Sequence, residues 1–134
     1  MNALTVSPLL RFALRLDALG SASAGVLASL LASPLAATLG VDPQRVLAVG
    51  VFMLGYGALV GWLGLHSRLP LAWVWSVVIG NSLWVLASVA LVFSDWIAPT
   101  AVGLALVLTQ AAAVAVFAEL QYLGLRRSLV QTPA

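Results

Sequence analysis

Residues 43–65 read PQRVLAVGVFMLGYGALVGWLGL, an apolar stretch in which Arg45, close to the start, is the one charged residue. A hydrocarbon core about 30 Å thick takes roughly 20 residues of α-helix to cross. Asp42-Pro43 is typical of a helix start, because proline suits the first turn and an aspartate before it can accept a backbone hydrogen bond. The stretch therefore predicts a membrane-spanning helix.

The rest of the chain is divided by proline in the same way. Further apolar runs start at Ser7-Pro8, Leu69-Pro70 and Ala98-Pro99. Ser7 is a second expected N-cap, and Ser94 or Asp95 is expected to cap the last helix. We predict membrane-spanning helices over residues 8–32, 43–65, 70–93 and 97–125.

Short connections between these helices favour antiparallel neighbours. The expected fold is all-α: a polytopic membrane protein built as an antiparallel up-down bundle of four transmembrane helices. Residues 1–134 form a single transmembrane domain in this interpretation. Ser33-Pro34 should end or kink the first helix, which leaves Leu35 to Val41 as a short surface lip. Met1 to Ser7 lack the features of a signal peptide, so none is expected.

The composition excludes a water-soluble globular domain. Of the 134 residues, 63% are apolar and 7% are charged, with a mean hydropathy of +1.11, whereas about a quarter of a soluble domain is charged. The absence of cysteine removes disulfides, thiolate metal sites and thiol catalysis. Six scattered arginines form no basic patch, so we expect the lipid bilayer, and no nucleic acid, as a partner.

The arginines also predict the orientation in the membrane. Five of them lie on the side of the predicted bundle that carries both termini and the loop between the second and third helices: Arg11, Arg15, Arg68, Arg126 and Arg127. The opposite side carries Arg45 alone. Because arginine accumulates on the cytoplasmic side, both termini are expected in the cytoplasm. Aromatic residues expected at the cytoplasmic interface are Trp62, Trp73, Trp75 and Tyr122, and Trp96 is expected at the other interface.

Glycines on the second predicted helix indicate a close helix contact. Gly50, Gly57, Gly61 and Gly64 share one face, and helices in lipid associate through small residues of this kind. Two interpretations are open. The face packs against another helix of the same chain, or it binds a second subunit in an oligomer.

Two carboxylates fall inside the predicted spans. Asp17 and Glu119 reach a similar depth in the cytoplasmic third, by the rise of an α-helix, and ionisable residues at such depths suggest function. The cations nearest to them are Arg11, Arg15, Arg126 and Arg127. Ion pairs could join the first helix to the fourth. Alternatively, a vestibule leaves one carboxylate unpaired to bind a proton or a cation, or the side chains extend to the interface.

A second polar layer is expected near the midplane. Asn81 and Gln110 lie at similar depths on helices of opposite direction, and Trp84 and Ser88 share the face of Asn81. One interpretation is a hydrogen bond from Asn81 to Gln110 or Trp84 that joins two helices. The other is a polar ligand or permeation site with Tyr56 at its rim.

Signals for enzymatic chemistry are missing from the sequence. His66 is the one histidine and suits an interfacial loop better than a haem or metal site. No Ser/His/Asp set, phosphate-binding glycine loop or HExxH motif occurs. We therefore expect no enzyme, no bound metal and no cofactor.

Three motifs resemble those of a group of small, uncharacterised bacterial four-helix membrane proteins. They are LRLDA at residues 14–18, NSLWVLAS at residues 81–88 and ELQYLGLRR at residues 119–127. The resemblance implies four membrane spans and a bacterial inner membrane. It implies no substrate, activity or partner.

Three classes of function remain open from the sequence. The first is a small transporter or channel for a solute, a proton or a cation, expected as an oligomer, which uses Asp17, Glu119 and the Asn81/Gln110 layer. The second is a non-catalytic accessory or scaffold subunit of a larger membrane complex. The third is a binder of a hydrophobic cofactor such as a quinone, with Trp84 and Tyr56 as walls.

Overall fold

The computed structural model describes residues 3–132 and is an all-α fold, 81% helical, with five helices. Its elements are β1 (Ala3–Thr5), α1 (Pro8–Leu30), α2 (Ala32–Leu39), α3 (Pro43–Leu63), β2 (Arg68–Pro70), α4 (Leu71–Val92) and α5 (Ala101–Gln131). Three helices, α3, α4 and α5, are long and apolar enough to cross a membrane, and the bent pair α1–α2 makes a fourth if it counts as one span.

The helix starts follow local capping chemistry. The Ser7 hydroxyl accepts a hydrogen bond from the Leu10 N–H, and the Asp42 carboxylate accepts one from the Gln44 N–H, as expected for these two N-caps. At the start of α5 the N-cap is Thr100. The expectation that Ser94 or Asp95 would cap this helix is therefore wrong, because the chain stays non-helical for several residues beyond them.

The first predicted span is interrupted near its end. Helices α1 and α2 meet at an angle of 93°, with the break at Leu31. Pro34 explains the break, because it has no N–H to donate to the Leu30 carbonyl and its ring clashes with that group. Residues 32–39 then form α2, so the expected surface lip is in fact mostly a short helix.

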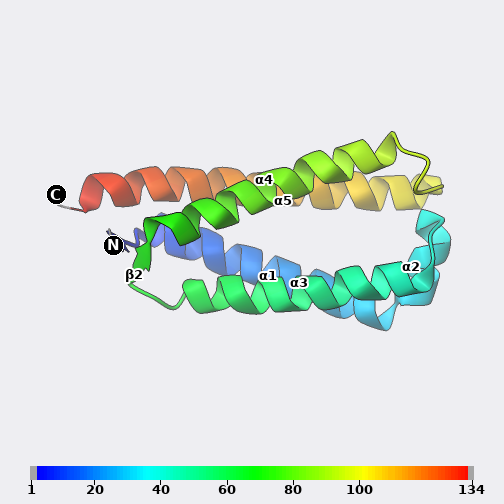
Figure 1. The fold of residues 1–134 in the computed structure, drawn as a ribbon, viewed down its shortest axis with the longest axis horizontal. Coiled ribbons are helices and arrows are strands. Elements are labelled where there is room, and N and C mark those ends of the chain that lie inside the picture. The colour runs from blue at the N-terminus through cyan, green and yellow to red at the C-terminus, as the bar shows by residue number, and fades with distance from the viewer. Residues whose placement is uncertain (1–2, 133–134) are drawn as a thin grey trace.

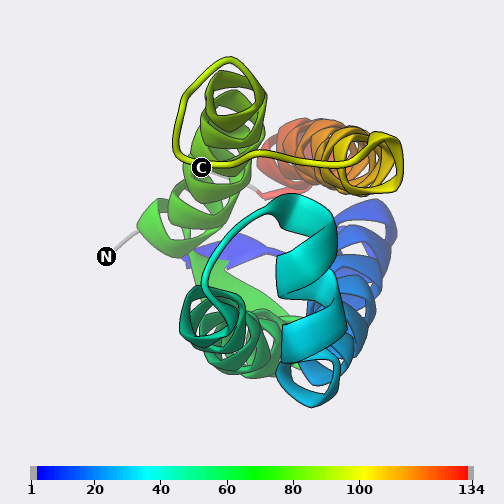
Figure 2. The ribbon, with the colours of Figure 1, turned by 90° about the vertical axis from the view of Figure 1, so that its right-hand side faces the viewer.

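The long helices form two layers (Figures 1 and 2). Helix α1 packs against α3, α4 packs against α5, and contact between α1 and α5 joins the two pairs. Helix α2 lies across one end, against α3 and α5. Strand β1 and the C-terminal end of α5 lie at the opposite end (Figure 1). The backbones of α3 and α4 approach each other at few positions along their length.

The glycine face of α3 is filled by α1 of the same chain. A Cβ on Gly57 would lie 2.9 Å from the Ala22 nitrogen, and one on Gly50 would lie 2.7 Å from the Ser29 hydroxyl. Gly61 and Gly64 also face α1. These glycines let the two backbones approach each other, so the face is not free for a second subunit and the oligomer interpretation does not fit it.

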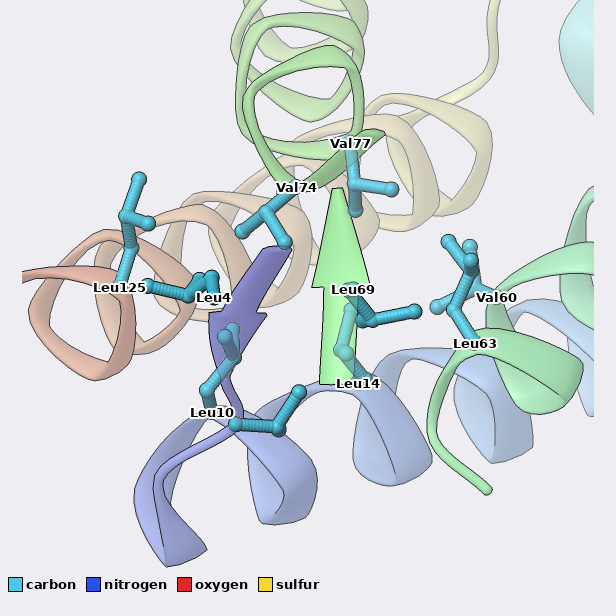
Figure 3. Close-up of a cluster of buried hydrophobic side chains, with 10 residues drawn as sticks. Leu4, Leu10, Leu14, Val60, Leu63, Leu69, Val74, Val77 and Leu125 are labelled. Atoms are coloured by element: carbon cyan, nitrogen blue, oxygen red, sulfur yellow. The ribbon is translucent and has the colours of Figure 1, made fainter. Parts of the chain in front are cut away.

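A small sheet that the sequence did not predict closes the end near the termini. β1 and β2 pair antiparallel, with Leu4 opposite Leu69. Their side chains join a buried apolar cluster (Figure 3). Next to it the Ser7 hydroxyl donates to the Gly124 carbonyl over 2.8 Å, and the Ser7 N–H donates to the Ser128 hydroxyl. These bonds fix the start of α1 against α5.

Candidate functional site: a buried carboxylate network

Asp17 on α1 is fully buried and lies at the centre of a hydrogen-bond network. Its Oδ2 accepts from Asn81 Nδ2 and from Gln121 Nε2, both at 2.7 Å, and lies 3.0 Å from the Tyr56 hydroxyl. Its Oδ1 accepts from the Ser21 hydroxyl over 2.9 Å. The Asn81 amide also donates to Gln121 Oε1 over 2.9 Å. Four helices, α1, α3, α4 and α5, thus contribute to one site.

The helix lengths explain why these side chains meet. Asp17 lies nine residues into α1, Asn81 ten residues into α4, Tyr56 seven residues before the end of α3, and Gln121 ten residues before the end of α5. At a rise of 1.5 Å per residue, all four lie about 10–15 Å from the end that carries the strands. They therefore reach one level of the bundle.

Tyr56 can satisfy only one of its two neighbours at a time. Its hydroxyl lies 2.8 Å from Asn81 Oδ1 and 3.0 Å from Asp17 Oδ2, but it carries a single proton to donate. A proton bound to Asp17 would remove the conflict. Asp17 could then donate to Tyr56 while Tyr56 donates to Asn81. The network therefore has a hydrogen-bonding position for one added proton.

The ion pairs expected between α1 and α5 do not form in residues 3–132. The donors to Asp17 are all neutral groups, and the Arg15 Nε donates to the Gly64 carbonyl instead. Glu119 and both Arg126 and Arg127 are exposed on α5. The two carboxylates are therefore not brought together, and a vestibule lined by both of them does not form.

The direction of Glu119 follows from helix geometry. Successive residues of an α-helix turn by about 100°, so Glu119 and Gln121 point to nearly opposite sides. Gln121 is fully buried and takes the interior position. Arg11, the remaining expected partner, is half-buried, and its Nε has no hydrogen-bond partner within the described residues.

The expected midplane layer is divided into two groups. Trp84 Nε1 donates to Gln110 Oε1 over 2.8 Å, and Gln110 Nε2 donates to the Ser88 hydroxyl over 2.9 Å. Asn81 and Tyr56 belong to the Asp17 network instead, so the expected bond from Asn81 to Gln110 or Trp84 is not the one formed.

The Phe52 ring lies between the two polar groups. It is nearly parallel to the Tyr56 ring, at a centroid distance of 6.4 Å, and to the Trp84 ring, at 6.1 Å. A cavity of about 100 Å³ adjoins these rings and reaches Ser21 and Asn81. It is large enough for a few water molecules or a small organic group. The Asp17 network therefore borders on open space through Tyr56 and Asn81.

Gln121 and Ser21 are the two network residues that the sequence analysis missed, and Gln121 is the one that a sequence pattern could have identified. A usable signal was present, because Gln121 lies eleven residues after Gln110, and eleven residues are close to three full helical turns. The two glutamines therefore share one face of α5. Since Gln110 was expected to face the interior, the same expectation should have extended to Gln121.

Comparison with known proteins finds no matching family model, no matching curated protein and no matching solved structure. The resemblance of residues 14–18, 81–88 and 119–127 to small bacterial membrane proteins thus stays a prediction. The features of the molecule that bear on function are the hydrogen-bond network around Asp17 and the cavity beside it.

Proposed function

We propose that the protein is a small multi-pass transporter of the bacterial inner membrane in which Asp17 binds a proton or a monovalent cation. The observation that carries this proposal is a fully buried carboxylate held by neutral donors from three other helices. Carboxylates inside a membrane are costly, and they mark ion pathways and proton relays.

The exposed surface supports insertion as an antiparallel four-helix bundle. Phe52, Leu83 and Leu86 are more than half exposed on the outer faces, where lipid would cover them. Trp96 is exposed near the α4–α5 connection, and further exposed aromatic residues lie near the other end: Trp62, Trp73, Trp75 and Tyr122. Such belts are typical of membrane interfaces. With most arginines near the strands, both termini would be cytoplasmic.

The hydrogen-bond arrangement favours an exchangeable cation over a purely structural role. A proton on Asp17 completes the chain from Asp17 through Tyr56 to Asn81, as described above. A monovalent cation is the other option, because four side chains carry an oxygen near the carboxylate: Ser21, Tyr56, Asn81 and Gln121. The amide groups of Asn81 and Gln121 can turn their oxygen toward the cation. Either ion would neutralise the buried charge.

An accessory or scaffold subunit is the second candidate. It is favoured by the fact that both oxygens of Asp17 already have hydrogen-bond donors, so the network can hold four helices together without any bound ion. In that case the only role of Asp17 is to hold the four helices together.

Ion flux in proteoliposomes tests the proposal. The purified chain is reconstituted, and proton, sodium and potassium gradients are imposed in turn with an ion-sensitive dye inside. We expect flux with the native chain, loss of flux in Asp17→Asn, and unchanged flux in Glu119→Gln, which changes an exposed carboxylate. Gel filtration in detergent must show that both variants fold.

The absence of flux under all three gradients would overturn the proposal, as would equal flux in folded Asp17→Asn. A stoichiometric membrane protein that co-purifies with the native chain in mild detergent would then favour the accessory role.

A further inference from the structure

The cavity beside the Asp17 network has a polar inner end and aromatic walls. Tyr56 and Asn81 lie at the inner end, while Phe52 and Trp84 contribute rings along the sides. The indole N–H of Trp84 already donates to Gln110, so this wall offers its ring and not its donor. The cavity therefore offers hydrogen bonds at one end only.

The outer end of the cavity reaches the surface between α3 and α4. Phe52 is 58% exposed, and Gly80 is exposed with nothing within 4 Å of the place where a Cβ would stand. Since the backbones of α3 and α4 approach each other at few positions, neither helix covers this opening. In an inserted bundle the opening faces the bilayer.

The size and chemistry of the cavity define its ligand class. A volume of about 100 Å³ is smaller than the roughly 150 Å³ of an engineered apolar cavity that binds benzene, so it takes a single small ring, part of which reaches the opening. Aromatic faces favour a planar ring in offset stacking. The Tyr56 hydroxyl and the Asn81 side chain favour a hydroxyl or carbonyl group on that ring.

We propose that this cavity binds a small, uncharged, planar ring compound that carries a hydroxyl or carbonyl group and enters from the bilayer between α3 and α4. The inference names the substrate class of the proposed transporter and rests on that function for transport, although not for binding. A ligand that bonds to Tyr56 or Asn81 competes with Asp17 for the same groups. Ligand binding and ion binding at Asp17 are therefore linked.

Fluorine NMR with para-fluorophenol in detergent micelles tests the binding step. We expect saturable broadening of the probe signal with the native chain. The same experiment with para-fluorotoluene, which has the ring without the hydroxyl, should give weaker binding by about fivefold, the equivalent of one neutral hydrogen bond. Tyr56→Phe should reduce this preference for the phenol.

Two glycine variants provide matched controls. Gly80→Leu adds a side chain at the opening of the cavity and should abolish the saturable signal. Gly55→Leu adds the same side chain at an exposed position of α3 that also has open space around it, and it should bind like the native chain. If Gly80→Leu binds normally, Val114→Phe tests the cavity wall on α5.

Broadening that never saturates, or that is equal in the native chain, Gly80→Leu and Val114→Phe, would overturn the inference, because it reports partition of the probe into the micelle. Failure of the transport proposal has a different signature, namely saturable binding of para-fluorophenol by a chain that conducts no ion in liposomes. Ion flux without saturable binding of para-fluorophenol would overturn the ligand site and leave the transport proposal in place.

Discussion

At the scale of single residues, Asp17 is predicted to be the side chain most sensitive to apolar replacement. In Asp17→Leu the amide hydrogens of Gln121 and Asn81 lose their shared acceptor, and a buried neutral donor left without a partner costs about 1–3 kcal/mol. We expect the free energy of unfolding to fall by about 2–4 kcal/mol, measured by denaturant titration in detergent.

Glu119→Leu is the control for this prediction. The Glu119 side chain is exposed, so its replacement should change the free energy of unfolding by no more than about 0.5 kcal/mol. Equal stability of Asp17→Leu and the native chain would show that the hydrogen bonds around Asp17 contribute nothing to the fold.

Tyr56 allows the hydroxyl to be separated from the ring. Tyr56→Phe keeps the ring beside Phe52 but removes the hydroxyl that donates to Asn81 Oδ1. We expect a loss of about 1 kcal/mol in the free energy of unfolding, the usual value for one neutral hydrogen bond. Tyr122→Phe, on the exposed face of α5, should be neutral in the same titration, and a loss as large as that of Tyr56→Phe would contradict the assignment.

The sequence was sufficient to single out Asp17, Tyr56 and Asn81, but not to bring them together. Each is a polar residue in an apolar run, and that is visible without a structure. Which of them share a level depends on where each helix begins. The partners could not be assigned without the rotation of each helix about its axis.

At the scale of the elements, the contact between α1 and α5 depends on Gly124. A Cβ at this position would lie 2.6 Å from the backbone of Leu10, so Gly124→Ala should push the two helices apart. Alanine favours a helix over glycine by about 1 kcal/mol, but overpacking of this kind costs about 1–3 kcal/mol. Since the obstacle is backbone, we expect a net decrease in thermal stability in detergent.

Gly55→Ala is the matched substitution on α3. Nothing lies within 4 Å of a Cβ at this position, so the higher helix propensity of alanine should act alone and raise the free energy of unfolding by up to about 1 kcal/mol. An increase in stability in both variants would show that helix propensity, and not the contact of α5 with Leu10, decides the outcome.

Local signals predicted the helices better than their connections. Pro8 and Pro43 start helices as expected, since a proline in the first turn acts through its own backbone. The strands β1 and β2 left no such signal. Their pairing joins Leu4 to Leu69, residues far apart in the chain, and three residues are too few for an alternating pattern to be recognised.

At the scale of the whole molecule, the Asp17 network is one of the connections between the two helix layers. Asp17 and Tyr56 belong to α1 and α3, whereas Asn81 and Gln121 belong to α4 and α5. The backbones of α3 and α4 approach each other at few positions, and β2 links them at one end. Beside the cavity, a movement that separates α3 from α4 has to break the hydrogen bond between Tyr56 and Asn81 and the ring contact between Phe52 and Trp84.

The orientation of the whole chain can be tested with single cysteines, because the native sequence has none. Ser67 and Gln131 lie near the strand end and are exposed, whereas Asp95 is exposed in the connection between α4 and α5. An impermeant thiol reagent should label Asp95→Cys in intact spheroplasts, and Ser67→Cys and Gln131→Cys only after permeabilisation. The physical reason is the five arginines near the strand end against Arg45 at the other. Labelling of Ser67→Cys and Asp95→Cys from the same side would mean that α4, the helix between these positions, does not carry the chain across the membrane.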